Sequence, residues 1–147
     1  MKLSNIYEYK SFEYDFLQNL CDVASSLKNN KISMDLTGGS DSRLLTVIFR
    51  EAGIDFETAV SGMSGHPDVE ISKMAAGLLR TTHYVTYHKA ENIDLAHELE
   101  ETFVNCDGLS DILNIHRLYQ FDCDRGERRI TLAISGSSGE LYKDGGW

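Results

Sequence analysis

Residues 32–45 read I-S-M-D-L-T-G-G-S-D-S-R-L-L, and this stretch decides the fold. An apolar-rich run ends at Gly38 and Gly39, and a helical pattern of apolar residues follows from Leu44. Because glycine has no Cβ, the backbone can take positive φ at these positions, and an anion can come close to the N–H groups. The stretch therefore predicts a strand, a turn that accommodates a phosphate, and a helix.

Residues beside the two glycines complete a predicted anion site. Thr37, Ser40 and Ser42 carry hydroxyl groups, and the helix that begins near Asp41 adds unpaired amides and the positive end of its dipole. The carboxylate of Asp41 would repel a bare phosphate, so we expect Mg²⁺ to lie between them. Walker A loops need a lysine after the glycines and dinucleotide loops need a third glycine, so neither pattern fits.

A known family has the same pattern of residues. Residues 37–42 resemble the S-G-G-x-D-S pyrophosphate loop of the ATP pyrophosphatase (PP-loop) superfamily, with threonine in place of the first serine. A second apolar run, Ile130 to Ile134, leads into another loop of small residues, as in the asparagine synthetase family. The positions that match the second loop of that family are Ser135, Gly136, Glu140, Gly145, Gly146 and Trp147. Residues 12–147 thus resemble the N-terminal half of its synthetase domain.

The resemblance implies ATP and Mg²⁺ as ligands and adenylation as the reaction. A small carboxylate substrate would attack the α-phosphate, pyrophosphate would leave, and an amine or ammonia would displace AMP to give an amide. Asp41 and Glu140 would bind the metal, and backbone groups would hold the adenine. No catalytic side chain is assigned. The residues that the resemblance assigns to ATP are Leu36, Thr37, Gly38, Gly39, Ser40, Asp41, Ser42, Val60, Ser61, Ser135 and Gly136.

Strand and helix patterns alternate along the chain. Strands are expected at Phe56 to Val60 and at His83 to His88, and a helix between them begins at Pro67. This order predicts a Rossmann-like α/β fold of the adenine nucleotide alpha hydrolase type, a parallel sheet with helices on both faces and the ligand at the carboxyl ends of its strands. The segment 122–129 has six charged residues in eight and predicts an exposed connection.

Two helices are expected to pack through apolar positions. The first helix is expected before residue 32, where apolar residues recur at helical spacing, and the second begins at Pro67. The positions expected to pack are Tyr14, Leu17, Leu20, Cys21, Ala24 and Leu27 in the first helix, and Val69, Ile71, Met74, Ala75 and Leu78 in the second.

Composition limits the classes of partner. The chain has 147 residues and a formal net charge of −9, which disfavours binding to nucleic acid and to anionic membranes. It lacks a signal peptide and an apolar run long enough to cross a bilayer, so we expect a cytoplasmic protein. We expect one domain over residues 1–147, truncated at its C-terminus relative to the family. Either a homodimer or the missing half would cover its remaining apolar surface.

Other interpretations stay open at this stage. A bare T-G-G-S-D-S is also ordinary helix-cap chemistry. The second loop has Ser137, Ser138 and Gly139 before the single Glu140, where many asparagine synthetases carry more than one acidic residue. A non-catalytic or truncated ATP-binding module is therefore one alternative. Another is a different PP-loop enzyme, such as a sulfur-transfer or amidating enzyme with its own acceptor, and the lack of basic patches makes tRNA the least favoured acceptor.

Overall fold

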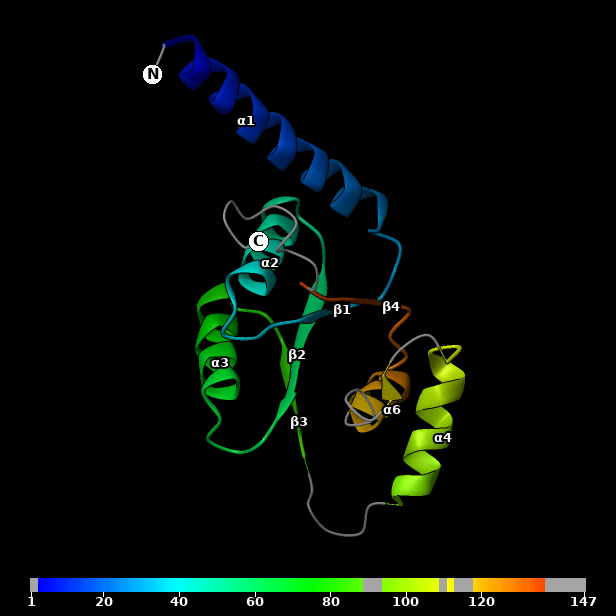
Figure 1. The fold of residues 1–147 in the computed structure, drawn as a ribbon. Coiled ribbons are helices and arrows are strands. Elements are labelled where there is room, and N and C mark those ends of the chain that lie inside the picture. Colours follow the sequence, from blue (N-terminus) through cyan, green and yellow to red (C-terminus); the bar gives the residue numbers. More distant parts are fainter. Residues whose placement is uncertain (1–2, 89–93, 109–110, 113–117, 137–147) are drawn as a thin grey trace.

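The computed structural model describes residues 3–88, 94–108, 111–112 and 118–136, with side chains from Tyr14 onward. Figure 1 shows the elements in chain order along the ribbon. They are α1 (Leu3–Ser26), β1 (Ile32–Asp35), α2 (Ser40–Glu51), β2 (Phe56–Gly62), α3 (Pro67–Leu79), β3 (His83–Tyr87), α4 (Leu95–Asn105), α6 (Tyr119–Glu127) and β4 (Leu132–Ile134).

The four strands form one parallel sheet in the order β3-β2-β1-β4. Ile32 of β1 pairs with Phe56 of β2 on one side and with Leu132 of β4 on the other. The chain moves outward from β1 to β2 and β3, and then returns to the opposite side of β1 for β4. The loops after β1 and β4 therefore flank the point where the direction of winding reverses.

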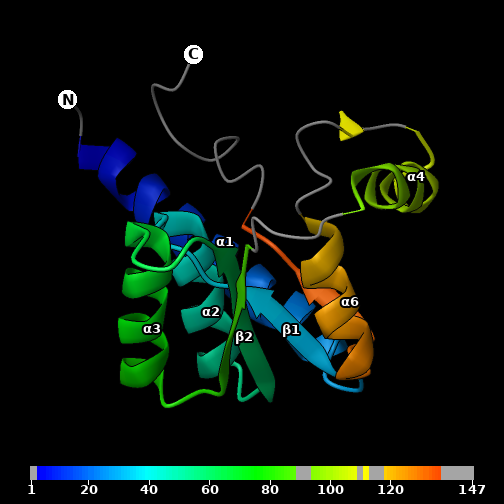
Figure 2. The same cartoon turned by 90° about the horizontal axis from the view of Figure 1, so that it is seen from below.

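Helices cover both faces of this sheet, as the sequence predicts. In Figure 2, α2 and α3 lie on one face, whereas α6 lies on the other. Helix α1 packs on α2, and α4 packs on α6. The Rossmann-like α/β architecture is confirmed. Among the described residues, no helix combines the length and the hydropathy that crossing a bilayer requires.

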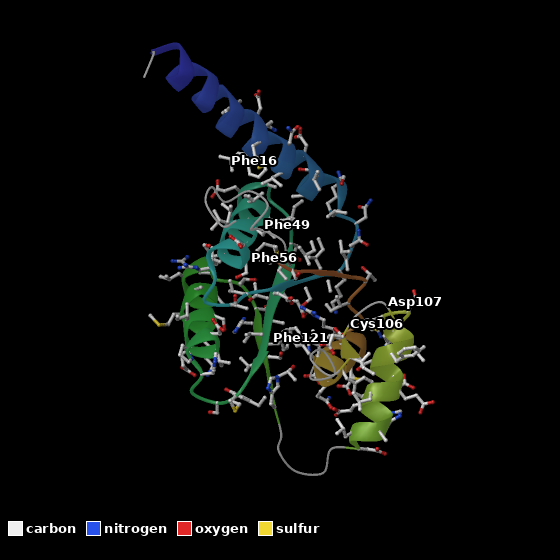
Figure 3. The ribbon with its side chains drawn as sticks, viewed as in Figure 1. Phe16, Phe49, Phe56, Cys106, Asp107 and Phe121 are labelled. Carbon is white, nitrogen blue, oxygen red and sulfur yellow. The ribbon has the colours of Figure 1, made fainter. Side chains whose placement is uncertain are left out.

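The face that carries α2 is apolar. Ile32 and Met34 of β1 are almost fully buried, and they pack in one cluster with Ala24 of α1. Phe49 of α2 meets Phe56 of β2 edge to face with ring centroids 6.4 Å apart, which Figure 3 shows between helix and sheet. Burying side chains of this size contributes about 1.5–3 kcal/mol each, so this face is the main source of stability.

The face that carries α6 is polar, and here a prediction is wrong. The segment 122–129 is not an exposed connection, because most of it belongs to α6. Arg125 of this helix is buried, donates from Nε to Ser33 Oγ at 3.3 Å and forms an ion pair with Asp35. Arg128 donates to Glu57 Oε1 at 2.9 Å. Charged residues are buried here because strand side chains on this face offer them partners.

Helices α1 and α3 form where expected, but their buried faces differ from the prediction. Ala24 of α1 is fully buried, whereas Tyr14 is 69% exposed, because the first part of α1 extends beyond the sheet (Figure 1). In α3, Leu78 is 86% exposed and Met74 is 70% exposed. The residues of α3 that are buried are Val69, Ser72 and Ala76. These small or short side chains let α3 lie close to β2, where a Cβ on Gly62 would be 2.9 Å from Val69.

Candidate functional site

The first glycine loop follows β1 directly and leads into α2. Leu36 is fully buried, and its N–H donates to the carbonyl of Ala59 in β2 at 2.9 Å. This bond extends the contact between the first two strands by one residue beyond β1. The loop therefore starts from a fixed point at the carboxyl edge of the sheet.

Side-chain hydroxyls fold the loop back onto the start of α2. The Thr37 N–H donates to Ser42 Oγ at 3.1 Å, and the two hydroxyl oxygens are also 3.1 Å apart. The Gly39 N–H donates to Thr37 Oγ1 at 3.1 Å. The exchange of serine for threonine at position 37 keeps the hydroxyl that makes these bonds. Two of the loop N–H groups are thus occupied inside the loop.

The third loop N–H reaches a different helix. Gly38 donates to Asp68 Oδ1 in the first turn of α3 at 3.0 Å. A Cβ on Gly38 would lie 2.7 Å from that oxygen and 3.2 Å from Ile71 Cδ1. The expectation of positive φ is wrong for both loop glycines, and Gly39 has φ −70°. A side chain at position 38 would require the Asp68 carboxylate to move, because α3 approaches the loop there.

The amino terminus of α2 is the remaining polar feature of this loop. Gly39 stands at its N-cap position and has no side chain with which to cap the helix. Helix geometry leaves first-turn N–H groups without partners inside the helix, and the dipole favours an anion there. Ser40 Oγ donates to Asp41 Oδ1 at 3.2 Å, and Arg43 Nε donates to the Gly39 carbonyl at 3.1 Å. A carboxylate and a guanidinium thus both lie beside this helix end.

The second loop meets the first one at this helix end. A Cβ on Gly136 would lie 2.7 Å from the backbone nitrogen of Ser42 and 3.0 Å from the carbonyl carbon of Asp41. The backbone after β4 therefore lies directly against the first turn of α2. Of the second loop, the structure describes residues 135–136, and these lie at the start of α2. Glu140, the second expected metal ligand, lies outside the described residues.

The other expected nucleotide residues lie along the same edge. Val60 is buried in β2, and Ser61 follows it in the same strand, where the two residues pair with Val85 and Thr86 of β3. Ser135 is exposed directly after β4. Ligands of open parallel sheets bind outside the carboxyl ends of the strands at the point where winding reverses. These residues and both glycine loops occupy that place.

A magnesium ion would fit this site only together with phosphate oxygens of a bound nucleotide and water. The described residues contain no group of three or more histidine, cysteine, aspartate or glutamate side chains that could hold a metal. Mg²⁺ is commonly held by one or two carboxylates together with phosphate oxygens of the substrate and water. Asp41, at the helix end where a phosphate would bind, can supply one such carboxylate.

Sequence reasoning assigned no role to Asp68 and His66. His66 is the N-cap of α3, and its Nδ1 accepts the Asp68 N–H at 3.3 Å. The signal was present, because α3 begins after β2 and so its first turn lies at the same edge of the sheet as the loop after β1. A polar first turn next to a glycine loop indicates a contact between them.

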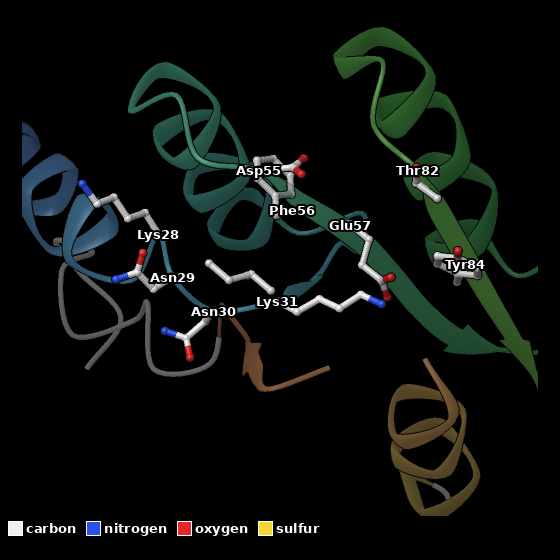
Figure 4. A pocket seen from close by; sticks show the side chains of 10 residues that line it. Lys28, Asn29, Asn30, Lys31, Asp55, Phe56, Glu57, Thr82 and Tyr84 are labelled. Carbon is white, nitrogen blue, oxygen red and sulfur yellow. The ribbon is translucent and has the colours of Figure 1, made fainter. Parts of the chain in front are cut away.

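A cavity of about 470 Å³ lies at the opposite edge of the sheet. Figure 4 shows its walls, which come from residues 28–32 at the start of β1, residues 55–57 at the start of β2, and Thr82 and Tyr84 near the start of β3. This amino-terminal edge lacks the loops that follow parallel strands, where ligands of such sheets bind. The cavity is therefore separate from the candidate site.

The fold is similar to that of solved synthetases. An NH3-dependent NAD synthetase from Campylobacter jejuni subsp. jejuni, in complex with the nitrate ion, is 16% identical, and the match covers 87% of this chain and 58% of that chain with a TM-score of 0.55. An NMN synthetase from Francisella tularensis is 16% identical, with 70% and 42% covered and a TM-score of 0.47.

These matches cover only part of the longer structures. The chain spans 58% of the length of the NAD synthetase. No family model matches the chain, and no curated protein matches its sequence. At this level of identity the comparison shows the fold alone: the chain folds as a parallel α/β domain like that of the NAD synthetase.

Proposed function

We propose that the chain binds ATP with Mg²⁺ and acts as an ATP-dependent, amide-forming ligase of the asparagine synthetase type. One observation carries the proposal: the backbone of Gly136 lies against the first turn of α2, so two glycine loops meet at a helix terminus that has no side-chain cap. This terminus flanks the point where the winding of the sheet reverses, which is where such sheets bind nucleotides.

Each part of the nucleotide has a proposed partner. The pyrophosphate portion lies at the amino terminus of α2, within reach of the hydroxyls of Thr37, Ser40 and Ser42. Asp41 and Glu140 would hold Mg²⁺, and the bound ion would neutralise part of the phosphate charge. Backbone at the ends of β1, β2 and β4 holds the adenine. The residues proposed for the adenine are Leu36, Val60, Ser61, Ser135 and Gly136.

The proposed reaction is adenylation followed by amide formation. A carboxylate oxygen of the substrate attacks the α-phosphorus of ATP, and the bond to pyrophosphate breaks. An amine or ammonia then displaces AMP. The contribution of the chain is electrostatic, because preorganised N–H groups at α2 stabilise the charge that gathers on the departing pyrophosphate. Arg43, whose guanidinium lies beside the loop, is the proposed additional cation.

The proposal extends to the surroundings of the site. We place the activity in the cytoplasm, within one domain that covers residues 1–147. The substrates are ATP and a small carboxylate, without nucleic acid or membrane partners. The proposed product is asparagine. A homodimer or a further half of the domain would complete the acceptor pocket.

The two alternatives from the sequence stand beside this proposal. An ATP-binding module without catalysis is one of them. The second alternative is an enzyme that joins ammonia to a different acceptor, since the NAD synthetase of similar fold is NH3-dependent. An assay of exchange between ATP and labelled pyrophosphate, with and without aspartate and other small carboxylates, separates them. Exchange that depends on one carboxylate names the acceptor, whereas binding without exchange indicates the module.

Asp41→Asn tests the metal-binding part of the proposal. The variant loses the charge that would hold Mg²⁺ beside the phosphates, and we expect calorimetry to show about tenfold weaker binding of MgATP, about 1.4 kcal/mol. Asp55→Asn, at the other edge of the sheet, is the matched control and should bind as the wild type does. Unchanged affinity in Asp41→Asn with an unchanged melting temperature would rule out the metal role.

A further inference from the structure

We propose that Asp68 is a positioning residue of the nucleotide site. By accepting the Gly38 N–H, it fixes the first glycine loop in the shape that presents the amino terminus of α2 to a phosphate group. This inference rests on the proposed function, because it concerns how the same site is organised. Asp68 belongs to a different strand–helix unit from the loop that it holds.

The contact joins two segments that are far apart in sequence. Asp68 Oδ1 and the Gly38 nitrogen are 3.0 Å apart and 30 residues apart along the chain. Hydrogen bonds between an N–H group and a carboxylate are stronger than those between neutral groups. Ile71, one turn further along α3, fills the remaining space at Gly38, where a Cβ would lie 3.2 Å from its Cδ1. The loop and the start of α3 are therefore built against each other.

Asp68 is itself held in place before any ligand binds. Pro67 sets the first turn of α3, and His66 caps the helix by accepting the Asp68 N–H at 3.3 Å. The carboxylate lies in the first turn, where the helix dipole stabilises a negative charge. These contacts fix the backbone of Asp68 at the start of α3, which places its carboxylate beside the loop.

Three backbone N–H groups of the loop already have acceptors within the protein. Thr37 and Gly39 donate to hydroxyls inside the loop, and Gly38 donates to Asp68, so these three groups face protein acceptors. The phosphate must then be held at α2 itself. Loss of Asp68 would free the Gly38 N–H and let the loop leave this shape. Binding of phosphate groups would weaken, whereas adenosine, which lies along the strand ends, would bind unchanged.

Three variants test this assignment by calorimetry with MgATP and inorganic pyrophosphate, and by competition with adenosine. Asp68→Ala removes the acceptor, and we expect about tenfold weaker binding of MgATP and pyrophosphate, in keeping with the loss of one charge-assisted hydrogen bond. Asp68→Asn keeps an oxygen that accepts from Gly38 and should stay within about threefold of the wild type. Glu70→Ala is the control, because Glu70 lies in the same turn but bonds to Lys73 at 2.9 Å.

A steric pair gives a second, independent test. In Gly38→Ala the new Cβ displaces the Asp68 carboxylate from the Gly38 N–H, so MgATP should bind more weakly than in the wild type. In the double variant Gly38→Ala/Asp68→Ala the collision with the carboxylate is gone. We therefore expect the two effects to be non-additive, with the double variant no weaker than Asp68→Ala alone.

Exchange of the Gly38 amide hydrogen reports on the contact without any ligand. It should be slower in the wild type and in Asp68→Asn than in Asp68→Ala. Equal exchange in all three proteins, or wild-type affinity in Asp68→Ala, would overturn the assignment. So would a loss that appears only when Mg²⁺ is present, since Asp68 would then be a metal ligand. If the wild type itself fails to bind MgATP, the proposed function fails, whereas the exchange result still decides whether Asp68 fixes the loop.

Discussion

Gly136 is the residue at which the two halves of the site meet. It lies so close to Ser42 and Asp41 that no side chain fits between the second loop and α2. Its role follows from space and not from left-handed backbone, because its φ lies outside that region. The same holds for Gly38, which faces Asp68 and Ile71. At both positions the site depends on the absence of a Cβ atom.

Gly136→Ala should separate the loops. A Cβ 2.7 Å from a backbone nitrogen cannot be accommodated without a backbone shift, so we expect a loss of about 1–3 kcal/mol in the free energy of unfolding. MgATP binding should weaken at the same time. Gly77→Ala in α3 is the control, since nothing lies within 4 Å of its Cβ position, and it should stabilise by about 0.5–1 kcal/mol. Urea unfolding of both variants measures this, and equal effects would contradict the steric account.

His83 joins β3, β2 and α3 through both ring nitrogens. Nδ1 is 2.9 Å from Thr58 Oγ1, and Nε2 is 3.1 Å from Ser72 Oγ. Burial lowers the pKa of His83 below its ordinary value, the nearby charge of Lys73 lowers it further, and an interaction with the Thr58 backbone opposes this. The folded protein therefore favours the neutral imidazole more than the unfolded chain does.

Stability should consequently fall as the solution becomes acidic. Above the unfolded pKa of about 6.5 the imidazole is neutral in both states, and its full contribution is present. As the pH falls through 6.5 towards the lower folded value, the unfolded chain takes up the proton first. Urea unfolding between pH 8 and pH 5 should show this decrease in the wild type and in His88→Gln, whose side chain is exposed. A slope that persists unchanged in His83→Gln would contradict it.

Helix α6 is held to the sheet by charge, unlike α2 on the other face. Arg125 stacks over Phe121 at 4.0 Å and reaches Ser33 and Asp35 on β1. Arg128 stacks over the Tyr84 ring at 4.2 Å and bonds to Glu57. In the described part of the chain, Nη2 of Arg128 is a buried side-chain nitrogen without a hydrogen-bond partner. Removing one partner of a buried ion pair leaves the other charge unpaired, so single changes within this interface should be costly.

Arg125→Met should destabilise the protein by about 2–3 kcal/mol, because it leaves the carboxylate of Asp35 without its strongest partner. Replacing both partners, as in Asp35→Leu/Arg125→Met, should recover most of this loss, since apolar pairs of similar volume often match buried ion pairs. Urea unfolding of the two single variants and the double variant forms the cycle. Strictly additive losses would show that the two side chains do not act together.

For the whole molecule, the sequence predicts the architecture well and its internal contacts poorly. Strand runs and the Pro67 helix start are local signals, and parallel strands bring their following loops to one edge. The contact between Asp68 and Gly38 depends on how α3 docks, which no local pattern encodes. Arg125 was expected to be exposed because charged residues are seldom buried without partners, and its partners lie on β1. Such pairings are visible only in the folded chain.

A ligand that bridges the loops after β1 and β4 should stabilise the entire domain. At a free MgATP concentration of about 100 times its dissociation constant, the free energy of unfolding should rise by about 2.7 kcal/mol. Thermal unfolding with and without MgATP measures this, and adenosine at the same concentration is the control for binding outside the phosphate region. A melting temperature that does not respond to saturating MgATP would show that the nucleotide does not link the loops.

The pairing of β1 with β4 has a consequence for biosynthesis. The backbone of Lys31, just before β1, contacts Thr131, just before β4, across 100 positions of the chain. During translation, β1, β2 and β3 can assemble on the ribosome while β4 is still to be made, and contacts of such long range form late and slowly. The nascent chain therefore holds an open sheet edge at β1 for several seconds before the site is complete. Chaperone capture at that stage would act on a protein that is largely folded but whose candidate site is still incomplete.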